Sequence, residues 1–282
     1  MKNLGYYNGK VGEFNEMTVP MGDRVNFFGD GVYDAVYSRN YIVFTLDEHI
    51  DRFYNSAKLL EINLPHTKEE FRDLVNSLVK KMDTGENFVY FQASRYTADV
   101  RAHVYDREKT ANILINIRPA NIADVYKKVK LITHEDLRFY YCNIKTLNLI
   151  PSVLYAQKAK DADCTETVLH RNGRVTECSH SNVHIIKNGT LYTAPLDNLI
   201  LPGISRRHLI NASKRLNIPV SETPFTLDDL YSADEVIITS VSNLCISAES
   251  IDGKKVKGGA PEILKKLQDE LLKEFIDGTT PC

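Results

Sequence analysis

The chain has 282 residues, 43% hydrophobic and 26% charged, with a formal net charge of −2 at pH 7. It is an ordinary soluble composition, long enough for one large or two medium domains. The charged residues are interspersed, which excludes a basic nucleic-acid-binding stripe. We expect no leader, because the first residues lack an apolar core, and no membrane-spanning helix, because no stretch approaches the necessary length. We therefore expect small molecules or a second copy of the chain as partners, and the cytoplasm as the location.

The first half of the chain predicts helices and strands in a mixed order. Apolar residues recur at three- and four-residue spacing over 48–62 and 68–82, which indicates two amphipathic helices. The stretch 118–128 is an expected joint between domains. Three segments rich in β-branched and aromatic residues are expected strands: 41–46, 87–96 and 111–120.

The second half predicts a different order of elements. Asn-Gly pairs inside 165–178 and 182–194 are strong signals for two β-hairpins. A helix is expected over 151–164, with Pro151 in its first turn. The other expected elements are strands at 129–136 and 234–243 and helices at 201–217 and 260–275. This mixture indicates an α+β fold without the regular strand–helix alternation of a doubly wound sheet.

The cysteines are widely spaced and odd in number, with no C-x-x-C pair and no histidine at metal-ligand spacing. We expect reduced thiols and predict no metal site. The five residues are Cys142, Cys164, Cys178, Cys245 and Cys282.

Lys145 lies among apolar and amide neighbours in "YYCNIKTLNLIPSVLYAQKA" (140–159), just before a predicted helix. Burying an ammonium without a partner is costly, and such a group tends to lose its proton and become a nucleophilic amine. Two interpretations stay open. The lysine either extends from the helix edge to solvent or forms a Schiff base.

Three other polar features could bind a charged ligand. "GISRRH", after Leu201 and Pro202, presents backbone N–H groups at a helix start, which suits phosphate. "ITSVSN" adds the hydroxyl groups of Ser240 and Ser242 at a strand end. Ordinary capping explains both equally well. Glu177 ends a hairpin strand with no pairing side chain expected in the next five residues, so it either faces a bound cation or is solvated.

Five motifs follow one another along the chain: "DRVNFFGDGVYDAV", "TLDEHIDRFYNSAKLL", "CNIKTLNLIPSVLYAQKA", "LHRNGRVTECSHSNVHIIKNGTLYTAP" and "ILPGISRRHLI". In this order they resemble the fold-type IV pyridoxal-phosphate enzymes, which include branched-chain and D-amino-acid aminotransferases and aminodeoxychorismate lyase. The resemblance covers nearly the whole chain. It implies a small N-terminal α/β domain (1–120), a larger C-terminal mixed β/α domain (121–282) with the Schiff-base lysine, a cofactor between them, and a homodimer.

The resemblance also implies roles for single residues toward pyridoxal 5′-phosphate. Lys145 is the Schiff-base lysine, Arg52 holds the phosphate with its planar fork, and Glu177 keeps the pyridine nitrogen protonated. Further cofactor contacts are implied for Leu201, Ile204, Ser205, Ser240 and Val241. Val241 stands where members of the group have Thr, so one hydroxyl contact is lost. Cys178 and His180 replace a usual Gly and Ser.

The substrate side resembles the D-amino-acid aminotransferases. Arg101 and His103 form an Arg-x-His pair in "SRYTADVRAHVYD", similar to a carboxylate trap that comes from the neighbouring subunit and acts with Tyr33. "TADVRAH" is one residue longer than its usual counterpart. We predict transamination between a D-amino acid, D-alanine or D-glutamate first, and a 2-oxo acid. The alternatives are a branched-chain L-amino-acid aminotransferase, an aminodeoxychorismate lyase, and a non-catalytic cofactor-binding or interaction protein.

Overall fold

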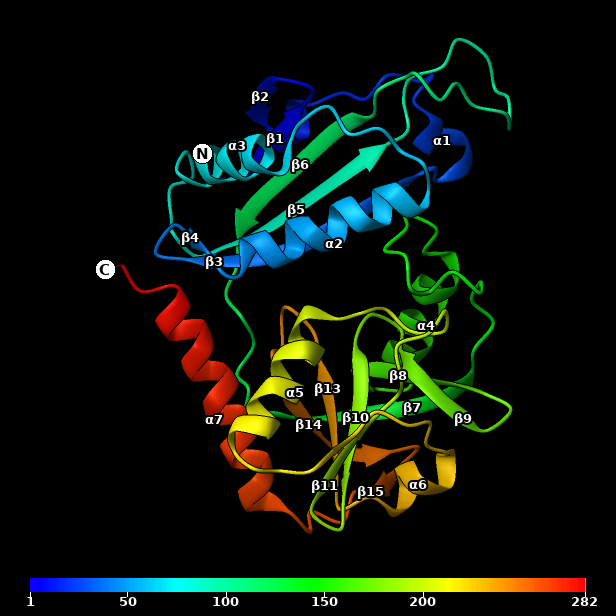
Figure 1. Ribbon diagram of the computed structural model, residues 1–282, viewed down its shortest axis with the longest axis vertical. Coiled ribbons are helices and arrows are strands. Elements are labelled where there is room, and N and C mark those ends of the chain that lie inside the picture. Colours follow the sequence, from blue (N-terminus) through cyan, green and yellow to red (C-terminus); the bar gives the residue numbers. More distant parts are fainter. Residues whose placement is uncertain (282) are drawn as a thin grey trace. The chain divides into compact units, whose positions relative to one another are not determined.

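The computed structural model describes residues 1–281, which divide into two compact units (Figure 1). Unit 1 comprises Met1–Asn121, Ile144–Asn148 and the residues from Ile276 onward, and unit 2 comprises Ile122–Asn143 and Leu149–Phe275. The division after Asn121 falls inside the expected joint 118–128. The segment with Lys145 belongs to unit 1, although its sequence position places it in the predicted second domain. No helix within residues 1–281 combines the length and apolarity needed to cross a membrane.

Unit 1 contains a six-stranded sheet in the order β2-β1-β6-β5-β3-β4, with every neighbouring pair antiparallel. The expected strand 41–46 is largely wrong. Asn40 and Tyr41 form a tight turn with φ of 54° and 63°, and only two residues pair as β4 before a helix begins at Leu46. The strands are β1 Leu4–Tyr7, β2 Lys10–Glu13, β3 Gly31–Arg39, β4 Ile42–Val43, β5 Asn87–Ser94 and β6 Asn112–Pro119.

Two helices, α2 (Leu46–Leu59) and α3 (Lys68–Val79), cover one face of this sheet (Figure 1) and confirm the two predicted amphipathic helices. Their contact with the sheet centres on three fully buried rings, Phe53, Phe71 and Phe91, whose centroids lie 5.1–5.4 Å apart. These aromatic contacts fix both helices against β5. The shorter elements of this unit are η1 Phe14–Glu16 and α1 Arg24–Phe28.

Unit 2 contains a nine-stranded sheet in the order β12-β11-β10-β13-β14-β7-β8-β9, with β15 added to β14. The β8–β9 and β10–β11 turns are Asn-Gly pairs with both φ angles positive, as both predicted hairpins require. Strand β7 runs parallel to both β8 and β14. The strands are β7 Lys128–Glu135, β8 Glu166–Arg171, β9 Arg174–Cys178, β10 Asn182–Lys187, β11 Thr190–Thr193, β12 Val220–Ser221, β13 Glu235–Thr239, β14 Ile246–Ile251 and β15 Lys254–Lys255.

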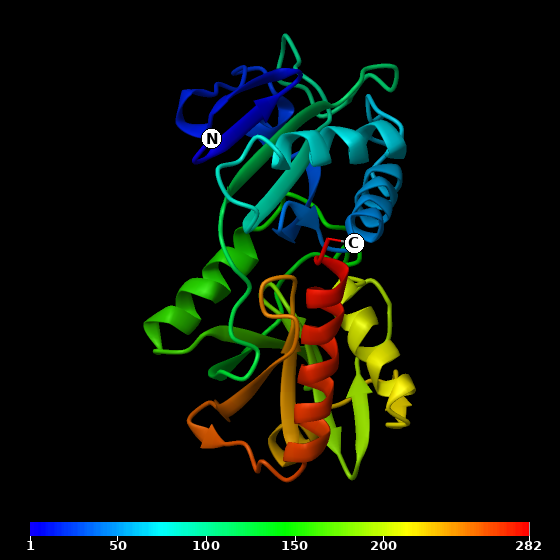
Figure 2. The same ribbon diagram turned by 90° about the vertical axis from the view of Figure 1, so that its left-hand side faces the viewer.

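The helices of unit 2 are α4 Ile150–Asp161, α5 Ile204–Arg215, α6 Leu227–Ser232 and α7 Pro261–Gly278, the last of which ends in unit 1. Helices α5 and α7 lie side by side (Figure 2), joined by an ion pair between His208 and Glu274. The predicted α+β fold is confirmed. Cys142, Cys164, Cys178 and Cys245 are free thiols, as expected, and Cys282 lies outside the described residues.

Candidate active site

The backbone around Lys145 is fixed against the first residues of β3. Tyr33 N donates to the Lys145 carbonyl at 3.0 Å, and Leu147 N donates to the Gly31 carbonyl at 3.0 Å. The Lys145 N–H donates to Ser56 Oγ on α2 at 3.3 Å. These bonds attach residues 144–148 to unit 1 as a short extra edge beside β3, which explains their place in that unit.

The Lys145 side chain is half-buried, and its ammonium lies over the ring of Tyr33, 4.4 Å from the centroid. Within residues 1–281, no carboxylate pairs with this nitrogen and no acceptor takes a hydrogen bond from it. A structural lysine at this depth would normally reach a carboxylate or bulk solvent. Among residues 1–281, no ion pair therefore explains the position of Lys145, and its ammonium has only the ring of Tyr33 as a close partner.

Arg52 is held by a carboxylate that the sequence analysis missed. Its Nε and Nη2 donate to Asp34 Oδ2 and Oδ1 at 2.8 and 2.7 Å, and His49 Nδ1 lies 2.8 Å from Oδ1. Burial would raise the pKa of Asp34, but Arg52 and His49 lower it well below its usual range. Strand alternation places Asp34 on the apolar core face with Val32 and Val36, a signal that a charged partner was needed.

The predicted substrate trap comes together only in part. Arg101 and His103 are exposed and both approach Phe28, at 4.8 Å from the guanidinium and 5.1 Å between ring centroids. The buried Arg24 fixes their loop by donating to the His103 carbonyl at 3.3 Å. Within residues 1–281, no hydrogen bond or ring contact joins this pair to Tyr33, which stacks on Tyr90 at 5.6 Å.

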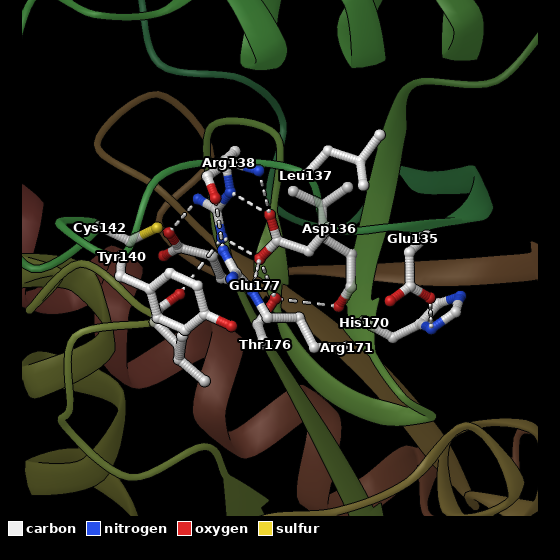
Figure 3. Close-up of polar contacts among 12 residues, drawn as sticks. Glu135, Asp136, Leu137, Arg138, Tyr140, Cys142, His170, Arg171, Thr176 and Glu177 are labelled. Atoms are coloured by element: carbon white, nitrogen blue, oxygen red, sulfur yellow. Dashed lines mark hydrogen bonds and ion pairs between the residues drawn. The ribbon is translucent and has the colours of Figure 1, made fainter.

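Glu177 is buried at the end of β9 and is not solvated (Figure 3). Its Oε1 accepts from Arg138 Nη1 at 2.5 Å, and its Oε2 accepts from Asn182 Nδ2 at 3.0 Å and Leu201 N at 2.9 Å. The expectation that no side chain in the following turn would pair with Glu177 is wrong, because Asn182 does so at the start of β10. Burial raises the pKa of Glu177, and the Arg138 guanidinium opposes that rise.

The contact with Leu201 couples Glu177 to the start of α5. Asn182 also donates to the Leu201 carbonyl at 3.0 Å, so one amide bridges the carboxylate and the segment before the helix. A Cβ at Gly203 would collide with Asn182 Oδ1, which only glycine avoids. The predicted Leu201 is therefore placed beside Glu177 through its backbone.

The turn with the two unusual residues surrounds a second buried acid, Glu166. Its Oε1 accepts from the His180 N–H at 2.7 Å, and its Oε2 accepts from Ser181 Oγ at 2.8 Å. The His180 ring is about half exposed and lies 3.1 Å from Oε1. Burial raises the pKa of the Cys178 thiol well above its usual value, so this cysteine is a packing residue.

The remaining predicted residues lie at one helix start and one turn. Helix α5 begins at Ile204 with no side-chain cap, and within residues 1–281 no acceptor takes a hydrogen bond from the Ile204 or Ser205 N–H. Ser240 Oγ lies 3.1 Å from Ser242 Oγ in the turn after β13, with Val241 between them half-buried. Free N–H groups at a helix start suit an anion.

The chain matches the family described as "Amino-transferase class IV" over residues 31–251, well over half of its length. The chain belongs to this family. The class IV aminotransferase is 41% identical to the D-alanine aminotransferase of Listeria innocua serovar 6a over 274 residues, covering 95% of each chain. It is 37% identical to the D-alanine aminotransferase of Bacillus licheniformis over 275 residues, covering 95% of this chain and 97% of the relative.

Solved structures share the fold of this class IV aminotransferase. A T.th. branched-chain amino acid aminotransferase with pyridoxamine 5′-phosphate has a TM-score of 0.90 at 25% identity, covering 100% of this chain and 96% of that one. The Escherichia coli branched-chain amino acid aminotransferase has a TM-score of 0.89 at 21% identity, covering 99% and 96%. The family and the enzyme class predicted from the sequence are confirmed.

Proposed function

We propose that this class IV aminotransferase uses pyridoxal 5′-phosphate to transfer amino groups between D-amino acids, D-alanine and D-glutamate first, and 2-oxo acids. The observation that carries this is the 41% identity, over 95% of both chains, to a protein named D-alanine aminotransferase. The relative solved with pyridoxamine 5′-phosphate supports the cofactor. The free thiols agree with a reducing compartment, so we assign the activity to the cytoplasm.

The residues present fit this cofactor. Lys145 offers an amine that no carboxylate within residues 1–281 neutralises, which suits an aldehyde. Ile204 and Ser205 offer unpaired N–H groups at the start of α5, which suit a phosphate, and the family resemblance gives Arg52 the same role. A carboxylate accepts about four hydrogen bonds, and three reach Glu177, leaving one acceptor site for a ring N–H.

When bound, pyridoxal phosphate supplies an aldehyde for the amino group and a ring that takes up the electron pair left when the α-carbon loses its proton. Lys145 would attach the cofactor and carry the proton away from the α-carbon. Glu177 would hold a proton on the ring nitrogen. Arg52 and backbone groups at Leu201, Ile204, Ser205, Ser240 and Val241 would hold the phosphate and orient the ring.

Arg101, His103 and Tyr33 would bind the substrate carboxylate, with the pair supplied by a second copy of the chain. An exposed apolar surface on unit 2 supports a homodimer, because patches of this kind mark interaction sites. Helix α4 exposes Ile150, Val153 and Leu154, and Leu137 of the adjoining loop donates its N–H to Tyr155 of the same helix at 2.9 Å. The loop part of the surface is Leu137, Phe139, Tyr140 and Tyr141.

A substrate screen tests the proposal. D- and L-alanine and D- and L-leucine are offered with 2-oxoglutarate as acceptor, and D- and L-glutamate with pyruvate. We expect faster turnover of the D-isomers, because Arg101, His103 and Tyr33 would bind the substrate α-carboxylate. A branched-chain site would line the same pocket with apolar groups. Faster turnover of L-leucine would favour the branched-chain alternative, and pyruvate release with an aromatic amine would favour a lyase. A protein that binds no pyridoxal phosphate would exclude the proposal.

A further inference from the structure

Arg138 lies between two buried carboxylates, Asp136 and Glu177 (Figure 3). The exposed fractions of the three side chains are 11%, 0% and 7%. The loop after β7 supplies Asp136 and Arg138, and the end of β9 supplies Glu177. None of the residue roles proposed above includes this arginine.

Asp136 fixes the plane of the guanidinium. Arg138 Nε donates to Asp136 Oδ1 at 3.0 Å and Nη2 donates to Oδ2 at 2.9 Å, which is a two-pronged contact. Thr176 Oγ1 holds Asp136 Oδ2 at 3.0 Å from the other side. With Nε and Nη2 bound, the remaining Nη1 is directed at Glu177 Oε1. A planar fork held at one edge presents its other edge in a single direction.

The same bond determines which acceptor site of Glu177 stays open. Oε2 already accepts from Asn182 and Leu201, so only Oε1 has room for another donor besides Arg138. We propose that Arg138 is a positioning residue that holds Glu177 as an anion, with the open site of Oε1 directed at the nitrogen of a bound pyridine ring. This rests on the proposed function and adds a residue to it.

The charges around Glu177 explain why it needs this arginine. Burial and the neighbouring Asp136 raise its pKa, and Arg138 is the cation that lowers it. Arg171, on β8, pairs with Asp136 at 3.3 Å and, among residues 1–281, forms no ion pair with Glu177. Burial raises the pKa of both nearby thiols, Cys142 and Cys178, so neither adds a charge at neutral pH. Without Arg138, the pKa of Glu177 would rise further, because only the Leu201 N–H would oppose burial and Asp136, and the carboxylate would be a poorer acceptor for a ring N–H.

The test compares two ligands that differ at one atom. Dissociation constants are measured for pyridoxal phosphate and for its carbon analogue, in which C–H replaces the ring nitrogen. The unmodified protein should prefer pyridoxal phosphate. Arg138→Met should reduce that preference roughly tenfold or more, with the affinity for the analogue unchanged, because only the contact at the nitrogen is lost. Arg171→Met, which removes the other guanidinium beside Asp136, should leave the preference intact.

A pH series separates positioning from general damage. In Arg138→Met, the preference for the nitrogen-containing ligand should return as the pH rises, because Glu177 then ionises without help. An equal loss of both ligands, or an unchanged preference, would overturn the proposal. If Arg138→Met does not fold, Arg138→Lys is tested in its place, because a single ammonium cannot make the contacts of the planar guanidinium. If Arg138→Lys prefers pyridoxal phosphate over the carbon analogue as strongly as the unmodified protein does, the proposal is overturned as well. Failure of the unmodified protein to bind pyridoxal phosphate would instead count against the proposed function.

Discussion

The Arg52 guanidinium and the Asp34 carboxylate form a two-pronged ion pair, with Nε–Oδ2 and Nη2–Oδ1 distances of 2.8 and 2.7 Å. The Asp34 side chain is fully buried and that of Arg52 is 10% exposed, so solvent screens the pair little. Removing the charge of Asp34 would break both prongs of this buried contact. The residue predicted to bind phosphate is therefore fixed in place by the protein itself.

Asp34→Asn should lower the free energy of unfolding by about 3 kcal/mol at pH 7, because it removes the anion from a buried two-pronged ion pair. Urea unfolding measures this. Asp47→Asn is the matched control, since its partner Arg72 is 40% exposed and such surface pairs contribute less than about 1 kcal/mol. The lowered pKa of Asp34 means that the pair stabilises the protein above the usual aspartate range and loses its effect as the pH falls below it. Equal losses in both variants would contradict this account.

His184 should make the protein sensitive to mild acid. Burial, with a smaller effect of Arg206, lowers its pKa to about 3. Between that value and the usual value of the unfolded chain, about 6.5, the unfolded state binds the extra proton, so stability falls as the pH drops. The loss between pH 7 and pH 5 should be about 2 kcal/mol. His184→Gln should flatten the pH dependence of urea unfolding in this range, and an unchanged pH dependence would contradict this account.

Lys145→Ala should keep cofactor binding and lose nearly all transamination. The residue would both attach the cofactor and move the α-proton, and an acid–base group alone contributes roughly a hundredfold to ten-thousandfold in rate. Absorbance of the bound cofactor and oxo-acid production measure the two effects. Lys58→Ala, at an exposed position of α2, is the control and should change neither. Turnover within tenfold of the unmodified enzyme would remove Lys145 from this role.

Local signals were enough to predict much of the fold. The Asn-Gly turns at 172–173 and 188–189 and the helical spacing of α2 and α3 act within a few residues, and all four elements are present. Asn8-Gly9 and Asp252-Gly253 carry the same turn signal and were missed, because β15 is only two residues long and β1 and β2 four. Strand 41–46 failed because a positive φ at Thr45 starts α2 where apolar content alone suggested a strand.

Site residues could be predicted only where a sequence motif or the neighbouring residues indicated them. Lys145, Arg52 and Glu177 were identified by resemblance to the family. The motifs do not name the residues that fix these three side chains in place. Asp34 is 18 residues from Arg52, and Arg138 is 39 residues from Glu177, so tertiary folding creates both pairs. A sequence can indicate that a buried charge needs a partner, as Asp34 on an apolar strand face does. It does not indicate which distant residue is the partner of that charge.

Gly203→Ala should lower the affinity for pyridoxal phosphate, although it replaces no charged residue. The new Cβ would collide with Asn182 Oδ1, so the buried amide must move and release both Glu177 and Leu201. We expect pyridoxal phosphate to bind roughly tenfold more weakly, as for the loss of one hydrogen bond to a charged group. Titration by absorbance measures it. Gly259→Ala, where the nearest atom is Asp234 Oδ1 at 3.2 Å, is the control and should bind normally.

Arg101→Ala should separate substrate recognition from cofactor binding. The side chain is exposed and lies on the ring of Phe28. There it either braces the loop or binds the carboxylate of a substrate held by the second copy of the chain. If it binds the carboxylate, the half-reaction with D-alanine should slow roughly ten- to a hundredfold, while cofactor absorbance and the mass of the proposed dimer persist. Stopped-flow absorbance and light scattering measure these quantities.

Arg107→Ala provides the matched control for Arg101. This arginine lies in the same loop, its side chain is 73% exposed, and it pairs with Glu61 at 2.9 Å. The substitution therefore removes the same charge as Arg101→Ala, at a position with no proposed contact to the substrate. Its half-reaction should stay within about twofold of the unmodified rate, because exposed pairs contribute little. If both variants slow equally, the loop's overall charge steers the substrate and Arg101 has no specific contact. If Arg101→Ala instead dissociates the dimer, the residue braces the interface, and the handedness of the reaction must come from other groups facing Tyr33.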